Sequence, residues 1–383
     1  MPGLIVDKVG GGGKAGEFDQ DNKNTFIDLP EEAFINVNEE SIRAYINSLY
    51  PGIEIGEKEI PHFRLKRGIS RPLITEWELT DPASLAITLP VKDGAHKFFV
   101  NWGDGSPEEL IENFTENIQH VYPALGTYQV KMWGVCEAFT FSNITNGPDG
   151  YVYPPDNFKL KAVISWGDLL FKKLDFHWCS NLVDLPLNEV PNLFYATSVN
   201  SLFYWCYKLT KVPECIFWNT PNTTDFSYLF VDTQLAEIPK LLFSRSISAK
   251  DFIGTFNGVD NFTEIPNQLF HSNPEARNFN DTFSNNGEFL KTIPFDLFYK
   301  NPKAETFARV FDGNDIQAIP SSLFANNPLA TNFERAFYLN KNLTGPVPEL
   351  WKREGSNGEE CFYQCTKVSN YAQIPDNWKN SAL

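Results

Sequence analysis

The chain has 383 residues, of which 42% are hydrophobic and 15% aromatic, and its formal net charge is −16. This length is enough for two or three domains with a sizeable buried core. The acidic balance argues against a nucleic-acid partner or an anionic membrane, because phosphate binding needs a basic surface. We expect no membrane insertion, since no apolar run reaches the roughly 18 residues of a spanning helix.

Residues 1–70 carry no repeat and are predicted to form an N-terminal anchoring or docking segment. One short amphipathic helix is expected between about residues 38 and 52, where acidic residues precede an apolar face and Pro-Gly follows it. A single helix cannot make a core, so we expect its face to pack on another domain, a sister subunit or a docking surface. The candidate docking residues on this face are Ile42, Tyr45, Ile46 and Leu49.

Residues 71–150 contain short runs of β-branched and aromatic residues separated by Gly, Pro and Asn, a pattern typical of an all-β sandwich. Residues 100–106 read V-N-W-G-D-G-S, and residues 120–130 contain H-V-Y followed by G-T-Y-Q-V. These motifs resemble the PKD domains, an Ig-like family, and the resemblance implies a spacer in a surface protein. We expect Asp104 to accept backbone hydrogen bonds in a turn, and His120 to pack nearby, in preference to metal binding or catalysis.

Eight prolines recur every 26 to 28 residues through residues 151–383. An apolar residue precedes each proline, and a Phe lies 9 to 13 residues upstream. A period in this range is typical of leucine-rich repeats, in which each coil stacks its apolar residues on those of the next. We expect Asn, Cys or Thr three residues after most of these Phe to face inward and satisfy backbone groups. The prolines are Pro186, Pro213, Pro239, Pro266, Pro294, Pro320, Pro348 and Pro375.

The repeat resembles the unit of the BspA-like leucine-rich repeat proteins, F-x-x-C-x-x-L-x-x-I-P-x-x-L-F, most closely from Phe203 to Pro213. This resemblance covers about residues 155–383 and implies adhesion or recognition. The expected fold is therefore mixed and mostly β. It comprises a leucine-rich-repeat solenoid of about eight coils, preceded by an Ig-like/PKD β-sandwich and a non-globular N-terminal segment.

We expect no enzyme activity and no catalytic, cofactor-binding or metal-binding residues. The five histidines are scattered and form no H-E-x-x-H motif, and no G-x-S-x-G motif is present. Cys179, Cys206 and Cys365 share one interior repeat position, which favours buried free thiols over disulfides or metal ligands. A glycan-cleaving pair of carboxylates stays open as an alternative, because such a pair is set by distances in the fold.

Aromatic residues outside the repeated Phe positions are candidates for carbohydrate or protein contact, because rings supply flat apolar area. The alternative is that these rings pack at the edges between coils. The candidate binding surface consists of Trp205, Tyr207, Trp218, Tyr228, Tyr299 and Tyr338.

The first eight residues contain no basic stretch leading into an apolar segment, so no secretory signal is expected. BspA-like and PKD-like modules also occur in phages of gut Bacteroidales and in their hosts. The resemblance therefore implies a bacteriophage virion protein, a head or tail fibre made in the host cytoplasm. It would dock on other virion proteins by its N-terminal segment, meet a host surface glycan or protein, and form a homo-oligomer. The alternatives are an exported bacterial cell-surface adhesin and a glycan depolymerase spike.

Overall fold

The computed structural model describes residues 71–91, 94, 96–112, 117–142 and 156–380, together with the backbone of three short strands. The chain divides into two compact units, Met1–Arg71 with Leu187–Glu189, and Pro72–Pro186 with Val190–Leu383. In the first unit, β2 pairs antiparallel with β1 and parallel with β3. These strands are β1 (Val6–Asp7), β2 (Phe26–Ile27) and β3 (His62–Phe63). The expected helix and the docking residues Ile42, Tyr45, Ile46 and Leu49 lie outside the described residues.

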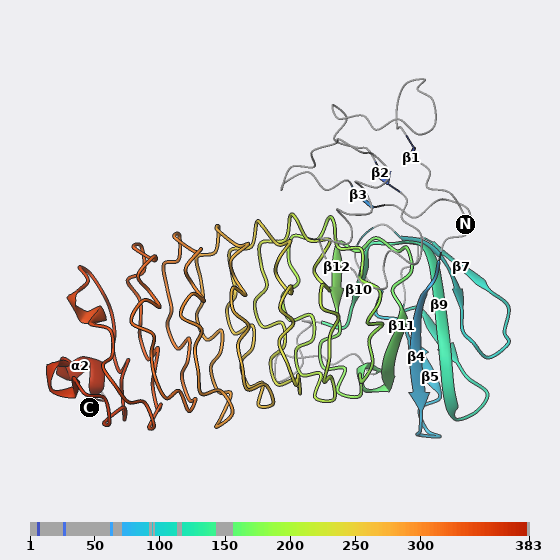
Figure 1. The fold of residues 1–383 in the computed structure, drawn as a ribbon. Helices are drawn as coiled ribbons and strands as arrows, with labels where there is room; N and C mark the ends of the chain where they lie inside the picture. The colour runs from blue at the N-terminus through green and yellow to red at the C-terminus, as the bar shows by residue number, and fades with distance from the viewer. Residues whose placement is uncertain are drawn as a thin grey trace. The chain divides into compact units, whose positions relative to one another are not determined.

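The second unit begins with a five-stranded sheet in the order β11-β4-β9-β6-β7 and a two-stranded sheet of β5 and β8 (Figure 1). Every neighbouring pair in these two sheets is antiparallel. The mostly-β character expected from the sequence is confirmed. The strands are β4 (Leu73–Leu79), β5 (Ala86–Thr88), β6 (His96–Asn101), β7 (Glu109–Glu112), β8 (Gln119–Val121), β9 (Gly126–Cys136) and β11 (Leu160–Ser165).

Alternating burial explains why these residues form strands. Along β4 every second side chain is buried, as is typical of a strand with one face on a core. Trp77 of β4, Phe98 of β6 and Met132 of β9 are all fully buried in that core. Before β11, the short 3-10 helix η2 (Asn157–Lys159) places the ammonium of Lys159 2.5 Å from the carboxylate of Asp156, and both side chains are buried.

The W-G-D-G-S motif forms a turn held by its aspartate, as expected. Asp104 Oδ1 accepts a hydrogen bond from the backbone N–H of Ser106, and its Oδ2 lies 2.7 Å from Nε2 of His120. The His120 ring stacks on Trp102 with centroids 4.8 Å apart. Burial raises the pKa of Asp104, but the hydrogen bonds from Ser106 and His120 outweigh it and hold the pKa well below its usual value. Both residues therefore have a structural role in this turn.

A parallel pair of short strands connects the β-rich part to the repeats. These strands are β10 (Ala138–Thr140) and β12 (Lys173–Asp175). The Asp175 carboxylate accepts hydrogen bonds from the backbone N–H groups of Phe141 and Ser142 and from the hydroxyls of Thr140 and Ser142. Since the Asp175 side chain is buried, these bonds fix the start of the repeats on the preceding strands.

The predicted leucine-rich-repeat solenoid is wrong. No strand follows β12 in the described residues, and Figure 1 shows successive loops without arrows up to α2. The sheets are small, and the β-pairing between the turns of neighbouring repeats is limited to isolated parallel bridges, such as Ser198 with Asp225 and Asp225 with Asp251. The described elements of this region are the 3-10 helices η3 (Leu350–Lys352) and η4 (Tyr371–Gln373) and the helix α2 (Asp376–Lys379).

Left-handed backbone conformations explain why no strands form. Seven successive repeats each place two residues, four positions apart, at φ between 52° and 69°. A strand requires extended backbone, so two left-handed residues interrupt it. The pairs are Ser201 and Trp205, Tyr228 and Asp232, Gly254 and Gly258, Asp281 and Asn285, Arg309 and Gly313, Arg335 and Leu339, and Glu360 and Gln364.

The turns of neighbouring repeats are nevertheless joined by backbone hydrogen bonds. The N–H groups of Phe226, Tyr228, Phe230 and Asp232 all donate to carbonyls of the next repeat, at 2.7 to 3.1 Å. Other N–H groups in the turns donate to the carbonyl three residues earlier, as Leu202 does to Val199. This arrangement satisfies the backbone without a regular sheet.

Stacked Phe rings form the core of the repeats, as the sequence predicted. The eight rings upstream of the prolines lie 5.4 to 5.7 Å apart from one repeat to the next, with planes within 20° of parallel. Two further Phe stacks lie beside them, one of which contains Phe270 and the other Phe279. The first stack consists of Phe176, Phe203, Phe230, Phe256, Phe283, Phe311, Phe337 and Phe362.

Inward polar side chains satisfy backbone carbonyls, also as expected. Nδ2 of Asn314 donates to the carbonyl of Phe283, and Nδ2 of Asn340 donates to that of Phe311. A second row of asparagines is also fully buried and donates two hydrogen bonds per side chain to backbone carbonyls. That row consists of Asn273, Asn301 and Asn327, and the guanidinium of Arg353 continues it. All six cysteines are buried free thiols.

Candidate binding surface

The left-handed turns of consecutive repeats lie next to one another and form one surface, which we call the turn face. It comprises residues 171–180, 198–207, 225–234, 251–260, 278–287, 306–315, 332–341 and 357–366. Six of these turns begin with a polar residue whose side-chain oxygen accepts a hydrogen bond from the backbone N–H two residues later. These six residues form a row: Ser198, Asp225, Asn278, Thr306, Asn332 and Asn357. Asp251 occupies the same row between Asp225 and Asn278.

Five rings gather at the first two turns and form what we call the aromatic cluster. The ring centroids of Trp178 and Trp205 are 3.9 Å apart, and those of His177 and Tyr204 are 4.7 Å apart. Trp205 also contacts Tyr204 at 5.1 Å and Tyr207 at 6.1 Å. Burial lowers the pKa of His177, although Asp175 opposes this, so the cluster carries no charge of its own at neutral pH.

A further ring, that of Tyr228, lies on the turn face and is 40% exposed. It covers the backbone of Gly254 in the next repeat, where an added Cβ would come within 2.7 Å of the Tyr228 ring. Burial raises the pKa of Tyr228, and the charges of Asp281 and Asp225 add to the rise. The ring therefore lies in the electrostatic field of carboxylates from its own and later repeats.

The carboxylate of Asp232 lies between the aromatic cluster and the following repeat. Its Oδ2 accepts a hydrogen bond from the indole Nε1 of Trp205 at 2.5 Å. An added Cβ at Gly258 would lie 2.4 Å from the Asp232 Oδ1, so the carboxylate lies directly over the Gly258 backbone. Burial raises the pKa of Asp232, and the Trp205 hydrogen bond opposes the rise.

Carboxylates without a basic partner follow the rings. Among the described residues, no lysine or arginine forms an ion pair with Asp225, Asp232 or Asp251. Burial raises the pKa of Asp251, and repulsion from Asp225 adds to this while Lys250 opposes it. Negative charge is thus concentrated here and is not neutralised by ion pairs within the described chain.

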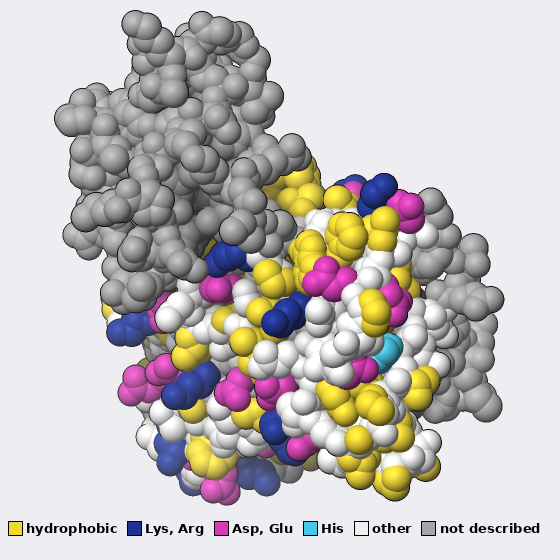
Figure 2. Space-filling model, turned by 90° about the vertical axis from the view of Figure 1, so that its right-hand side faces the viewer, with side chains coloured by type: hydrophobic (Ala, Val, Ile, Leu, Met, Phe, Trp, Pro, Cys, Tyr) yellow, Lys and Arg dark blue, Asp and Glu magenta, His cyan; other side chains and the backbone are white. Residues whose placement is uncertain are grey.

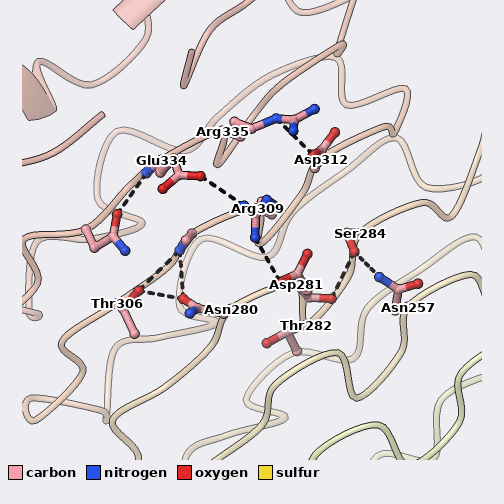
Figure 3. Close-up of polar contacts among 12 residues, drawn as sticks. Asn257, Asn280, Asp281, Thr282, Ser284, Thr306, Arg309, Asp312, Glu334 and Arg335 are labelled. Atoms are coloured by element: carbon pink, nitrogen blue, oxygen red, sulfur yellow. Dashed lines mark hydrogen bonds and ion pairs between the residues drawn. The ribbon is translucent and has the colours of Figure 1, made fainter. Parts of the chain in front are cut away.

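The last repeats differ, because arginines pair with carboxylates there (Figure 3). Arg309 lies between Asp281 and Glu334, with nitrogen–oxygen distances of 3.8 and 2.9 Å. Arg335 lies between Asp312 and Glu360, at 3.6 and 3.7 Å. Its guanidinium carbon is 3.8 Å from the centroid of the Tyr338 ring, which in turn stacks on Tyr363. Each arginine therefore joins three successive repeats.

The structure brings together some of the six candidate binding aromatics and separates others. Trp205 and Tyr207 belong to the aromatic cluster, Tyr228 lies one repeat further on, and Tyr338 lies beneath Arg335. Two candidates lie outside the turn face. Trp218 is only 8% exposed and carries the guanidinium of Arg245 over its ring at 4.4 Å, whereas Tyr299 is 53% exposed, near the ring of His271.

Sequence reasoning missed His177, Trp178 and Tyr204 of the aromatic cluster and the carboxylates Asp225, Asp232 and Asp251. A signal for two of the rings was present, because Trp178 precedes Trp205 and His177 precedes Tyr204 by one repeat of 27 residues. The carboxylates carry no comparable signal in a chain with 48 acidic residues.

Other surfaces are less distinctive. On the side of the β-rich part shown in Figure 2, hydrophobic side chains gather in several patches among residues of both charges. A shallow depression of about 300 Å³ is lined by Lys291, Thr292 and Ile293 and by residues 317–320. In the described ranges, no three His, Cys, Asp or Glu side chains converge to hold a metal ion, and no helix is long and apolar enough to cross a membrane.

Comparisons with known proteins identify no family. No family model matches the chain, and no curated protein matches it. One solved structure, that of the Toll–Spatzle complex of Drosophila, matches at 14% identity over 47% of this chain and 39% of that chain. Its TM-score of 0.14 is too low to support an argument about fold or function. The resemblances to BspA-like and PKD proteins therefore remain predictions.

Proposed function

We propose that this protein is a non-enzymatic binding protein whose turn face contacts a molecule on a cell surface. The observation that carries the proposal is the aromatic cluster, five rings in mutual contact of which Tyr207 is 44% exposed. Contiguous, partly exposed rings are typical of binding surfaces, because they supply rigid apolar area at low entropic cost.

The setting that we propose is a bacteriophage virion, in which the protein is a head or tail fibre that docks by residues 1–70 and meets a host surface glycan or protein. A bacterial cell-surface adhesin is the other setting in which such a face would act. Support for the virion comes from the resemblance of the repeats and of the V-N-W-G-D-G-S motif to modules found in such phages. Immunogold electron microscopy of phage particles and uninfected cells tests this, because gold confined to the cell envelope would overturn the virion setting.

Binding through the turn face is tested with fluorescent full-length protein and candidate host cells. The variant combines Tyr207→Gln and Tyr228→Ser, since Gln234 and Ser201 occupy the corresponding positions of neighbouring repeats and the changes should leave the fold intact. The control is Tyr299→Ser, which removes an exposed ring outside the turn face and matches Ser244. We expect the double variant to lose about tenfold in apparent affinity and the control to bind as the unchanged protein does. Equal losses in both would overturn the proposal.

A further inference from the structure

Charge changes along the turn face in a way that indicates the chemistry of the partner. The four turns at residues 198–207, 225–234, 251–260 and 278–287 contain no lysine or arginine. They carry the carboxylates of Asp225, Asp232 and Asp251, which form no ion pair with a lysine or arginine of the described residues, and that of Asp281, which pairs with Arg309 at 3.8 Å. Four exposed or half-buried rings lie beside them, those of Tyr204, Trp205, Tyr207 and Tyr228. We call these four turns together the acid–aromatic section; Lys250 and Arg277 lie directly before two of them. Arginine enters the turn face only in the next repeat, at Arg309.

The last repeats show how a guanidinium is held on this face. Arg335 projects from its turn so that one ring, Tyr338, lies 3.8 Å from its guanidinium carbon. Carboxylates of the preceding and following repeats, Asp312 and Glu360, lie 3.6 and 3.7 Å from its Nε. A planar, delocalised cation suits such a site, since it stacks on a ring and attracts carboxylates at its edge.

The acid–aromatic section offers the same groups without the arginine. Gly254 occupies the repeat position of Arg309 and Arg335, and it has no side chain. The ring of Tyr228 lies against it, and the charges of Asp225 and Asp281 act on the Tyr228 hydroxyl. The charge of Asp232 acts in the same way on Tyr207. A ring and a carboxylate of this section are also in direct contact, because the indole Nε1 of Trp205 lies 2.5 Å from Oδ2 of Asp232.

We propose that the acid–aromatic section binds an arginine-bearing segment of a partner protein, whose guanidinium groups interact with its rings and carboxylates as Arg335 does in the later repeats. This inference rests on the proposed binding function and specifies the partner of the same surface. Adjacent turns are about 4.8 Å apart, so four turns span about 15 Å, the length of four or five residues of extended peptide. A neutral glycan would use the rings but leave the carboxylates desolvated without a partner.

The proposal is tested by isothermal titration calorimetry of the full chain at about 0.15 M salt. The probes are the peptide acetyl-(Arg-Ser)₄-amide, its Lys-Ser and Glu-Ser counterparts, and a glucosamine hexamer as a cationic glycan. We expect the arginine peptide to bind, the lysine peptide to bind about threefold to tenfold more weakly, and the acidic peptide not to bind. Binding of the glucosamine hexamer without binding of the arginine peptide would identify a glycan and overturn the proposal, as would no binding of any probe.

Matched variants separate a specific site from the general attraction of an acidic protein. Asp225→Asn with Asp251→Asn removes two charges from the section, and Asn278, Asn332 and Asn357 show that this row accepts asparagine. The control, Glu237→Gln with Glu264→Gln, removes two exposed charges outside the turn face. We expect the first pair to weaken binding of the arginine peptide about tenfold and the control less than about twofold. Equal effects would show that the attraction is unspecific and would overturn the inference.

Failure of this inference is distinguishable from failure of the proposed function. If the unchanged protein binds cells, the double tyrosine variant does not, and the arginine peptide neither binds nor competes, then the surface is a binding site for a different ligand. If neither cells nor peptides bind, both proposals fall.

Discussion

The indole Nε1 of Trp205 donates a hydrogen bond of 2.5 Å to Oδ2 of Asp232, a residue 27 positions further along the chain. The two side chains come from neighbouring repeats, so this bond connects the aromatic cluster to the carboxylates that follow it. Because burial raises the pKa of Asp232 and the hydrogen bond opposes that rise, Trp205 favours the ionised carboxylate beside an apolar ring.

Replacing Trp205 by Phe should keep much of the ring contact but remove the donor. We expect Trp205→Phe to lower the free energy of unfolding by about 1 to 2 kcal/mol, because a partly buried carboxylate loses its hydrogen bond. Urea denaturation of full-length protein measures this. Trp351→Phe is the control, since the described residues offer the Trp351 indole ring contacts with Phe362 and Trp378 but no hydrogen bond. Equal losses in both variants would contradict the prediction.

The buried asparagine row should be more important for stability than any exposed amide. Nδ2 of Asn301 donates to the carbonyls of Phe270 and Asn273, both at 2.9 Å, in a fully buried position. Asn301→Ala is expected to lower the free energy of unfolding by about 1 to 3 kcal/mol, because two buried hydrogen bonds are lost, although both carbonyls keep a backbone hydrogen bond. Asn222→Ala, which removes one exposed bond to Phe194, should cost about 0.5 kcal/mol or less. Similar costs would show that the buried bonds contribute little.

Glycine should stabilise a left-handed position that now holds another residue. Gln364 is exposed and has φ of 61°. We expect Gln364→Gly to raise the free energy of unfolding by about 0.5 to 1 kcal/mol, because glycine adopts this conformation without strain. Thr366→Gly, at a neighbouring exposed position with negative φ, should have the opposite effect. A loss of thermal stability in Gln364→Gly would argue against left-handed turns in this repeat.

Stability should depend on pH through Asp312. Burial raises the pKa of Asp312 to about 6, although Arg335 opposes the rise and Asp281 adds to it. In the unfolded chain this carboxyl titrates near 4, so the folded state binds the proton more tightly and loses stability as pH rises from about 4 to about 6. Asp312→Asn avoids this loss. The free energy of unfolding of Asp312→Asn, minus that of the unchanged protein at the same pH, should therefore increase by roughly 2 kcal/mol as the pH rises from about 4 to about 7. A difference that does not vary with pH would contradict the assignment.

The buried rings of the repeats could be predicted from the sequence because their spacing repeats. Phe203 and Phe230, for example, lie at the expected positions and stack with centroids 5.7 Å apart. The backbone of the turns could not be predicted in this way. Tyr228 and Arg335 are left-handed without being glycine, and only Gly254, Gly258 and Gly313 mark these positions in the sequence. The same spacing of apolar residues fits parallel strands, which is why a solenoid was expected.

The candidate binding surface was predictable in part. Trp205 and Tyr207 were expected to contact a ligand, and they lie in the aromatic cluster. Trp218 belongs to the same residue class but follows the Pro213 position, where the chain packs inward and its ring is buried. The proposed role of the carboxylates depends on the lack of an ion pair within the described residues, as at Asp225 and Asp251, and ion pairing between repeats is a property of the fold and not of local sequence.

The most direct test of the central claim, that the turn face binds through its rings and carboxylates, is hydroxyl-radical footprinting of the full-length protein with and without the arginine peptide or host cells. Side-chain oxidation is read residue by residue. The account predicts that oxidation of Trp205, Tyr207 and Tyr228 falls on binding, while that of Tyr299 is unchanged. Protection of Tyr299 with no change at the three turn-face rings would contradict it.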